Sequence, residues 1–472
     1  MREDFVGRAE EMARLESQLA AVREGRGRLV SVRGRRQAGK SRLISEFVRR
    51  TGLPQLFVTG ARQATLQRDL DRFVEDARLD CTLPGADGLT AGGFTSWEQA
   101  LRATFAALPA DAPAIVVIDE FPWLLARDPG IDGTLQKLWD RLFESRPVLM
   151  FLIGSDLAVM ELLTSHQRPL FGRAREMVVE PFSIGDTARM LAIGPDRASD
   201  AFDAQLITGG YPRLLLEWRR SGDMTRFLND QLADENSELV VTGQRVLDAE
   251  FPADLQAGQV LRAVGAGDRA FSAIAARAGI AATPLTRALA LLTEKRVIAA
   301  DLPTSVKIGN LSRYRVADPY LRFWLRFIED AVSDIQRGRP DLARTRVTGG
   351  WIKYRGRAVE PLVRLALARL ATDDPVLGGA ETVGGWWPRN NTPEIDLVGV
   401  RSVGGGVNAV TFVGSIKWRD NEPFTQRDLD YLLRDRAAVP GGEFAPPIAV
   451  TRTTTEAVGL ATYDPARLLG AW

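Results

Sequence analysis

The sequence predicts an α/β protein whose first third forms a doubly wound parallel sheet. Strand-like runs at residues 28–33, 114–118 and 148–153 alternate with stretches of helical periodicity. The second and third runs are uninterrupted apolar segments, which are typical of parallel strands buried on both faces. Strands that alternate with helices favour such a sheet. We also expect a helix at 8–22, before the first run, and a helix at 40–50 and a further strand at 55–58 after it.

Length and composition limit the class of protein. The 472 residues are too many for one compact core, so we expect several domains. Cys81 is the only cysteine and His166 the only histidine, which excludes a disulfide framework and argues against a structural zinc site. No apolar run is long enough to span a membrane, and the charged start lacks a signal-peptide core. We therefore expect a cytoplasmic protein without a membrane partner.

One motif points directly to chemistry. Residues 34–41 read G-R-R-Q-A-G-K-S, which matches the P-loop pattern between an expected strand and an expected helix. Backbone N–H groups of such a loop surround phosphates, and the helix N-terminus favours negative charge there. The motif predicts a nucleoside triphosphate site, most simply for ATP, in which the lysine reaches the β- and γ-phosphates and the serine ligates Mg²⁺. The expected nucleotide-binding residues are Gly34, Gln37, Ala38, Gly39, Lys40, Ser41 and Arg42.

A second element supports hydrolysis of the nucleotide. Asp119 and Glu120 follow the buried run 114–118, at the carboxyl end of a strand, where open α/β sheets bind ligands. We expect Asp119 to hold Mg²⁺ together with Ser41. Glu120 is the candidate to polarise the attacking water.

Several further segments resemble one family of P-loop proteins. Residues 5–10 read F-V-G-R-A-E, residues 169–173 read P-L-F-G-R, and residues 210–212 read G-Y-P. Together with the P-loop, these segments are similar to the archaeal-type ATPases, a branch of the STAND and AAA+-related P-loop NTPases. The resemblance covers roughly residues 3–240.

The resemblance implies roles for individual residues. Val6 and Gly7 would contact the adenine, with Arg8 as a polar neighbour. Ser155 corresponds to the family's sensor position at a strand end. Arg173 would read the γ-phosphate, either in its own subunit or in a neighbouring one. Pro212 belongs to a helical lid, so this ATPase domain with its lid is expected to span residues 1–245.

The middle of the chain, residues 246–328, has the proportions of a winged helix-turn-helix. Helical stretches at 273–278 and 283–295 flank Gly279, and short strands at 297–300 and 314–316 would form the wing. Such a module places its second helix in a DNA major groove. That helix is poor in base-reading side chains, however, so a protein-interaction role stays open beside DNA contact. Its exposed basic candidates are Arg287, Lys295 and Arg296.

The last part, residues 329–472, resembles the PD-(D/E)xK nuclease fold, an α/β restriction-endonuclease-like domain. The resemblance implies that Glu360, Asp396 and Lys417 occupy the nuclease positions, where carboxylates hold Mg²⁺ and the lysine orients water. Ser415 stands where an acid is expected, so one metal ligand is missing. Either a nearby carboxylate replaces it, or the domain has lost cleavage and Asp396 with Lys417 forms an ordinary ion pair. The basic stretch 332–357, which contains Gly349 and Gly350, is interpreted as a linker or hinge.

These observations lead to one main hypothesis and two alternatives. The main hypothesis is an ATP-binding and Mg²⁺-dependent ATP-hydrolysing switch that acts on or near double-stranded DNA through its later modules. The first alternative is a nucleotide-gated scaffold that binds a protein partner or a second copy of itself without DNA. The second is an ATP-regulated nuclease that depends on a metal ion.

Overall fold

The computed structural model describes residues 5–62, 65–250, 255–307, 311–403 and 408–472. The first four residues, part of the charged start on which the signal-peptide expectation rests, lie outside these ranges. The chain divides into two compact units, Met1–Pro181 and Phe182–Trp472. Each unit is described by itself below.

The first unit is built on a five-stranded, fully parallel sheet. Its strands are β1 (Arg28–Arg33), β2 (Gln55–Thr59), β3 (Ala114–Asp119), β4 (Val148–Gly154) and β5 (Ala174–Val178). They are arranged in the order β2-β3-β4-β1-β5. The parallel sheet that the sequence predicts is confirmed, and four of the five strands lie within two residues of their expected bounds. Because β1 and β3 both run toward the same edge, the P-loop and the acidic pair emerge at that edge.

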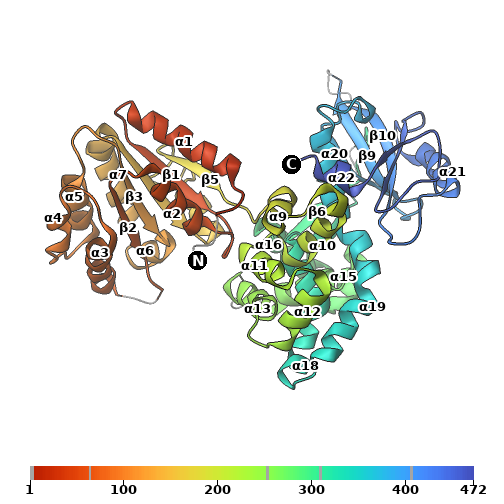
Figure 1. Cartoon of the computed structure of the whole chain (residues 1–472), viewed down its shortest axis with the longest axis horizontal. Coiled ribbons are helices and arrows are strands. Elements are labelled where there is room, and N and C mark those ends of the chain that lie inside the picture. Colours follow the sequence, from red (N-terminus) through yellow and green to blue (C-terminus); the bar gives the residue numbers. More distant parts are fainter. Residues whose placement is uncertain (1–4, 63–64, 251–254, 308–310, 404–407) are drawn as a thin grey trace. The chain divides into compact units, whose positions relative to one another are not determined.

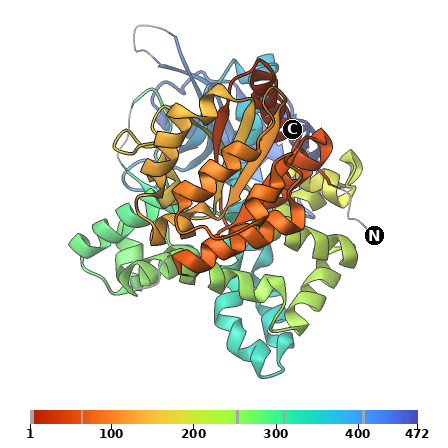
Figure 2. The same ribbon diagram turned by 90° about the vertical axis from the view of Figure 1, so that its left-hand side faces the viewer.

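Helices cover both faces of this sheet (Figures 1 and 2). On one face, α1 (Ala9–Arg23) and α2 (Lys40–Thr51) bury residues such as Leu15, Ile44 and Phe47 against the strands. On the other face a separate apolar cluster joins the sheet to the remaining helices. These are α3 (Leu66–Asp80), α4 (Ala86–Thr90), α5 (Trp97–Ala107), α6 (Phe121–Arg127), α7 (Ile131–Arg141) and α8 (Leu157–Leu163).

The second unit begins with helices and continues into a two-stranded hairpin. The first group is α9 (Ile184–Leu191), α10 (Ala198–Thr208), α11 (Pro212–Ser221), α12 (Met224–Ala233) and α13 (Glu238–Glu250). Then come α14 (Leu255–Gly265), α15 (Phe271–Ala278) and α16 (Ala282–Glu294), followed by the antiparallel pair β6 (Ile298–Asp301) and β7 (Arg313–Val316). Three helices and a hairpin are the elements that a winged helix requires.

The chain ends in a mixed α/β part. Its sheet has the order β12-β11-β10-β9-β8, in which β9 and β10 are antiparallel and β10, β11 and β12 are parallel. The strands are β8 (Thr382–Trp386), β9 (Ile395–Ser402), β10 (Asn408–Lys417), β11 (Pro447–Thr451) and β12 (Ala461–Tyr463). The helices are α17 (Pro319–Phe323), α18 (Val332–Gln336), α19 (Pro340–Ala358), α20 (Glu360–Leu370), α21 (Gln426–Asp435) and α22 (Pro465–Leu469).

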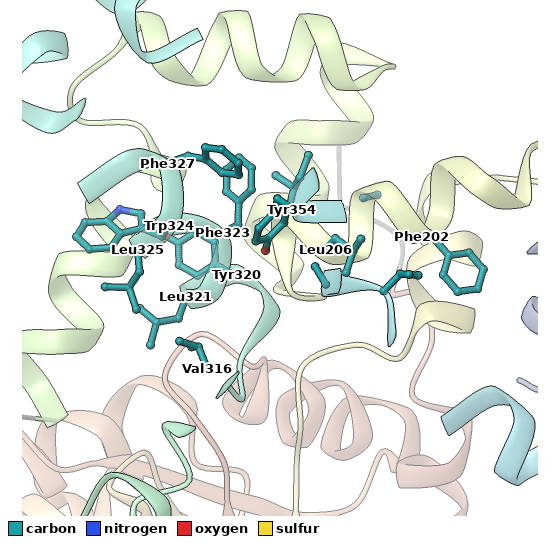
Figure 3. Packing of buried hydrophobic residues seen from close by; sticks show 14 of the residues in the cluster. Phe202, Leu206, Val316, Tyr320, Leu321, Phe323, Trp324, Leu325, Phe327 and Tyr354 are labelled. Atoms are coloured by element: carbon teal, nitrogen blue, oxygen red, sulfur yellow. The ribbon is translucent and has the colours of Figure 1, made fainter. Parts of the chain in front are cut away.

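One apolar core runs through the whole second unit. Its residues come from helices α9 to α20 and from the C-terminal sheet. Figure 3 shows its aromatic centre, where Phe323 and Phe327 lie with Tyr354 while Phe202 extends toward the C-terminal part. Phe202 packs against Trp418, with ring centroids 4.9 Å apart. The helical, middle and C-terminal parts of this unit therefore share a core.

The interpretation of residues 332–357 as a linker is wrong. This stretch forms α18 and most of the nineteen-residue helix α19. A Cβ atom at Gly350 would lie 2.6 Å from Phe327, so this glycine permits close packing of the helix against an aromatic ring. The composition resembled a hinge because contacts between distant residues are not visible in a local pattern.

A helix that spans a membrane must be both long and strongly apolar. Within the described ranges, no helix combines the length and the apolar character that crossing a bilayer requires.

Candidate functional site

The P-loop lies where the sequence places it, between the end of β1 and the start of α2. Gly39 has φ 91° and Gln37 has φ 63°, so the loop turns through the left-handed region at two positions. A Cβ atom at Gly34 would lie 2.1 Å from the carbonyl oxygen of Val179, so only glycine fits there. The loop leads directly into the N-terminus of α2, where phosphates bind in such loops.

Lys40 is held inside this loop. Its ammonium group donates hydrogen bonds to the carbonyl oxygens of Gly34 (2.8 Å) and Arg35 (2.9 Å), and the residue is 6% exposed. Burial lowers the pKa of Lys40 to about 8, although the nearby charges of Glu120 and Asp119 act in the opposite direction. A buried cation beside two carboxylates is suited to receiving the negative charge of a triphosphate. Ser41 and Arg42, the next two residues, are exposed at the first turn of α2.

Arg8 supports the loop from the N-terminal segment. It is 3% exposed, and its guanidinium donates to the carbonyl oxygen of Ala38 and to Glu11, each at 2.6 Å. Val6 and Gly7 precede it in a half-buried segment. The structure thus connects this segment to the P-loop through Arg8, and the proposed adenine contacts of Val6 and Gly7 stay predictions.

Asp119, Glu120 and Ser155 come together at the same edge. Asp119 is buried, and its carboxylate accepts a hydrogen bond from the backbone N–H of Glu120 at 2.8 Å. Glu120 has the left-handed values φ 51° and ψ 42°, which cost roughly 1–3 kcal/mol and recur at functional sites. The Ser155 hydroxyl lies 3.0 Å from both carboxylate oxygens of Glu120, to which it donates. Glu120 is therefore held in place and keeps lone pairs that can accept from a water.

The oxygen atoms at this edge fit a magnesium ion. Mg²⁺ prefers one or two carboxylates, a hydroxyl, waters and substrate phosphates. The buried Asp119 carboxylate lies near the Lys40 ammonium, and the exposed Ser41 hydroxyl is the residue after Lys40. Ser41 and Asp119 are thus the residues that would hold the ion.

Two arginines beside this edge were missed by the sequence interpretation. Trp123 lies three residues after Glu120, and the guanidinium groups of Arg36 and Arg62 lie 5.9 and 5.5 Å from its ring centroid. Arg36 belongs to the P-loop, and Arg62 follows β2. Arg127 holds the backbone of this segment by donating to the Trp123 carbonyl oxygen at 2.7 Å. The local sequence gives no signal for this cluster, because its members are up to 87 positions apart.

Arg173 does not reach the P-loop edge of its own sheet. It precedes β5, whose first residue pairs with Leu29 near the start of β1, whereas the P-loop follows the end of β1. At about 3.3 Å per residue, the two positions are separated by roughly 15 Å along the strands. The Arg173 guanidinium instead pairs with Asp140 at 2.6 and 2.8 Å. Of the two roles expected for Arg173, the structure offers no support for the one within its own subunit.

Pro212 lies in the second unit, as the first residue of α11. The preceding Gly210 has φ 77°, and a Cβ atom there would lie 2.1 Å from the carbonyl oxygen of Phe182. The G-Y-P segment therefore makes a tight turn against the start of its own unit. Its contact with a nucleotide stays a prediction.

In the C-terminal part, the expected nuclease positions are engaged by protein groups. The Asp396 carboxylate accepts hydrogen bonds from Ser415 Oγ at 3.0 Å and from the backbone N–H of Ile416 at 2.8 Å. Burial, with the charge of Glu360 nearby, raises the pKa of Asp396 to about 6. Glu360 pairs with Arg364 at 3.1 Å, and Lys417 pairs with Asp428 at 3.1 Å. Glu360 and Asp396 lie near each other, whereas the ammonium group of Lys417 is paired with a residue of α21.

Ser415, which stands where the resemblance expects an acid, donates a hydrogen bond to Asp396. Loss of cleavage by this domain stays a prediction. Among the residues that the structure describes, no group of three acidic, histidine or cysteine side chains is arranged to hold a metal ion. The expected ion pair between Asp396 and Lys417 is also not formed, since each has another partner. Trp386, Trp387 and Trp418 of the same part are buried, so their rings are not available as a stacking surface for nucleic acid.

Comparison with known proteins agrees with this site. Residues 4–150 match the AAA ATPase domain family. Residues 324–429 match a second family, described as archaeal and bacterial proteins of unknown function. The resemblance to the archaeal-type P-loop ATPases is confirmed by these two matches, which make the N-terminal part similar to AAA ATPase domains and the C-terminal part similar to the second family.

Individual relatives are distant. This chain is 23% identical to an uncharacterized protein of Methanocaldococcus jannaschii over 326 residues, which are 68% of this chain and 70% of the relative. A Walker-type ATPase of Pyrococcus abyssi has a similar fold, with a TM-score of 0.50 and 22% identity over 69% of this chain and 97% of that one. The ORC2 protein of Aeropyrum pernix, solved as ADPNP–ADP complexes, matches with a TM-score of 0.45 and 14% identity. The match covers 71% of this chain and 97% of that one.

Proposed function

We propose that this chain is a molecular switch of the STAND/AAA+ type, which binds ATP with Mg²⁺ at the P-loop and hydrolyses it. The observation that carries this proposal is the convergence of Lys40, Asp119, Glu120 and Ser155 at one edge of the sheet. Nucleotide binding without hydrolysis would require only the loop and its lysine. A carboxylate that is fixed by a hydroxyl beside that lysine supports hydrolysis as well.

Each residue has a defined task in the proposed reaction. Lys40 exchanges its two carbonyl partners for phosphate oxygens and neutralises charge on the β- and γ-phosphates. Glu120 accepts a hydrogen bond from the attacking water and orients it, while Ser155 keeps the carboxylate in position. Ser41 and Asp119 would hold Mg²⁺, which supplies further neutralisation of phosphate charge when bound. Arg173 would act only from a neighbouring copy of the chain.

Two substitutions test the nucleotide site. We expect Lys40→Ala to abolish ATP and ADP binding, measured by calorimetry, because the buried ammonium is lost from the loop. Lys137→Ala is a matched control: it removes the other lysine of the first unit, which pairs with Glu98 on α5. Unchanged affinity in the Lys40 variant would show that the P-loop assignment is wrong.

Hydrolysis is tested separately. Glu120→Gln should bind ATP with nearly normal affinity but turn it over about 10²–10⁴ times more slowly, the usual range for loss of a general base. Release of phosphate under single-turnover conditions measures the chemical step. Normal turnover in this variant would exclude Glu120 from catalysis while leaving nucleotide binding intact.

A second part of the proposal concerns DNA. Helix α16 turns Thr283, Thr286 and Arg287 to solvent, which supports a limited contact with a duplex by this helix. We expect binding to double-stranded DNA to weaken with salt, and Arg287→Ala to reduce the salt slope by about 1. Arg277→Ala is the control, since Arg277 pairs with Asp268 within the same module. Binding that does not depend on salt would instead favour the cytoplasmic scaffold that recognises a protein partner or a second copy.

A further inference from the structure

The hairpin β6–β7 contacts the C-terminal part of the same unit, and one arginine makes several of these contacts. Arg313 is the first residue of β7 and is buried. Its guanidinium lies 4.2 Å from the ring centroid of Trp387, pairs with the carboxylate of Glu394 and donates to the side-chain oxygen of Asn391 at 3.0 Å. An aromatic face, a carboxylate and an amide oxygen thus surround a single guanidinium group.

Trp387 also forms a hydrogen bond with the segment between the two strands of the hairpin. It is 3% exposed, and its indole Nε1 donates to the carbonyl oxygen of Leu311 at 2.9 Å. The ring therefore binds the hairpin by its edge and Arg313 by its face. A cation over an aromatic face is held more strongly when both are removed from water.

Charge is balanced around this contact. Three carboxylates gather here, those of Glu360, Glu394 and Asp396, and three guanidinium groups accompany them. Arg269 lies 3.6 Å from both Glu360 and Glu394, Arg313 pairs with Glu394, and Arg364 binds Glu360 and the Asp396 carbonyl oxygen. Two of these arginines, Arg269 and Arg313, come from the middle of the chain. Of the two acidic nuclease-like positions, Glu360 is thus paired with arginines, whereas the Asp396 carboxylate is bonded by Ser415 and Ile416.

The backbone of the hairpin segment fits the same surface. The Thr304 N–H donates to the carbonyl oxygen of Gly385 at 2.8 Å. A Cβ atom at Gly384 would lie 2.0 Å from Thr304 Oγ1, so this close approach requires glycine. A Cβ atom at Gly441 would likewise lie 2.8 Å from Val306. The segment therefore contacts the C-terminal part at Thr304 and Val306 as well as at Arg313.

We propose that Trp387, Glu394 and Asn391 form a guanidinium-binding pocket whose resident ligand is Arg313, and that this pocket locks the hairpin to the C-terminal part. A planar guanidinium can stack on the indole and donate in fixed directions to the carboxylate and the amide, which a lysine ammonium cannot match. The seated hairpin is therefore not available to follow a DNA backbone as the wing of a winged helix does. DNA contact by the middle of the chain is left to α16.

Hydrogen exchange of the full-length chain tests the lock, because the Thr304 amide is protected only while the segment is seated. We expect Arg313→Ala and Glu394→Gln to raise exchange at Thr304 by about tenfold or more, since a partly buried, charge-assisted hydrogen bond is lost. Arg315→Ala is the matched control: Arg315 lies on the same strand but pairs with Asp301 inside the hairpin. Equal exchange in the Arg313 and Arg315 variants would overturn the proposal.

Chemical rescue tests the ligand class. Methylguanidinium added to the Arg313→Ala variant should restore protection at Thr304, whereas tetramethylammonium at the same concentration should not. Arg313→Lys should resemble Arg313→Ala, because it keeps the charge and loses the planar fork. Protection restored equally by both cations, or by neither, would show that the pocket does not recognise guanidinium. Glu394→Gln gives an independent measure of the lock if an Arg313 variant fails to fold.

Discussion

At the scale of single residues, the nucleotide edge depends on a few side chains whose partners are distant in sequence. Asp119 and Glu120 are visible in the sequence because they follow a buried strand. A role for Ser155 as a sensor was predicted through family resemblance, but its contact with Glu120, across 35 positions, required the fold. Trp123 with Arg36 and Arg62 could not be anticipated, because nothing in the local pattern connects them.

Ser155 should act on hydrolysis and not on binding. We expect Ser155→Ala to lower the single-turnover rate about 10- to 100-fold, because a hydrogen bond to a charged group contributes about 1.5–3 kcal/mol. The affinity for ATP should stay within a factor of two or so, since Ser155 bonds to Glu120 and not to the loop. Ser45→Ala, an exposed serine on α2, is the control. A Ser155 variant that hydrolyses ATP normally would show that the contact with Glu120 is dispensable.

Within a single copy of the chain, Arg173 should not affect the rate of ATP hydrolysis. In dilute solution we expect Arg173→Ala to hydrolyse ATP at the parent rate, because its ion pair with Asp140 lies at the opposite edge of the sheet. Asp140→Asn breaks the same pair from the other side and serves as the control. Rates measured over a range of protein concentrations separate the two roles. A loss confined to the Arg173 variant at high concentration would indicate action on a neighbouring copy, and a loss at every dilution would contradict this placement.

At the scale of elements, α2 shows how a helix that starts at the P-loop is stabilised at its other end. Its apolar residues pack on the sheet, and Glu46 pairs with Arg49 and Arg50 near its last turn. The hydrogen bond from Arg49, aided by Arg50, lowers the pKa of Glu46 to about 2. The periodicity of the helix was visible in the sequence, and so was the spacing of these charges.

The ion pairs of Glu46 should make stability depend on pH in a defined direction. Because the folded pKa is depressed, the stabilisation is present above the ordinary value of 4.5 and is lost as pH falls toward 2. We expect Glu46→Gln to lower the free energy of unfolding by about 0.5–1 kcal/mol at pH 7, a small value because both guanidinium groups are largely exposed.

Urea unfolding of the full-length chain at pH 7, 4 and 2.5 measures this effect. The difference between Glu46→Gln and the parent should shrink at each step. Glu10→Gln, which removes an exposed pair with Arg14 on α1, should change little at any pH. A difference that grows on acidification would contradict the assigned direction.

At the scale of the whole molecule, the sequence suggested three domains, whereas the contacts separate two compact units at Pro181. Residues 182–245, expected to belong to the ATPase domain as its lid, share a core with the rest of the second unit. Asp203 of α10 pairs with Arg355 and Arg452, and both arginines also pair with Asp420. The boundaries at 245 and 328 stay predictions, but within the second unit the parts they define are joined by packing and charge.

The contacts at the nuclease-like positions lead to a prediction about nucleic-acid cleavage. We expect the full-length chain to leave DNA uncut in the presence of Mg²⁺ or Mn²⁺, because Glu360 is paired with Arg364, Asp396 is bonded by Ser415, and Lys417 is paired with Asp428. Asp396→Ala should behave as the parent does in the same gel assay. Cleavage by the parent that the Asp396 substitution removes would show that the domain is an active nuclease.

The sequence by itself determined the parallel sheet, the P-loop and the acidic pair. Each of these depends on residues that are neighbours in the chain, so a local pattern carries the signal. Only the tertiary structure decided that Arg173 lies away from its own nucleotide edge, that residues 332–357 are largely helical, and that arginines pair with Glu360. These outcomes depend on strand register, on close packing at single glycines and on ion pairs between distant positions. Such contacts exist only after the chain has folded.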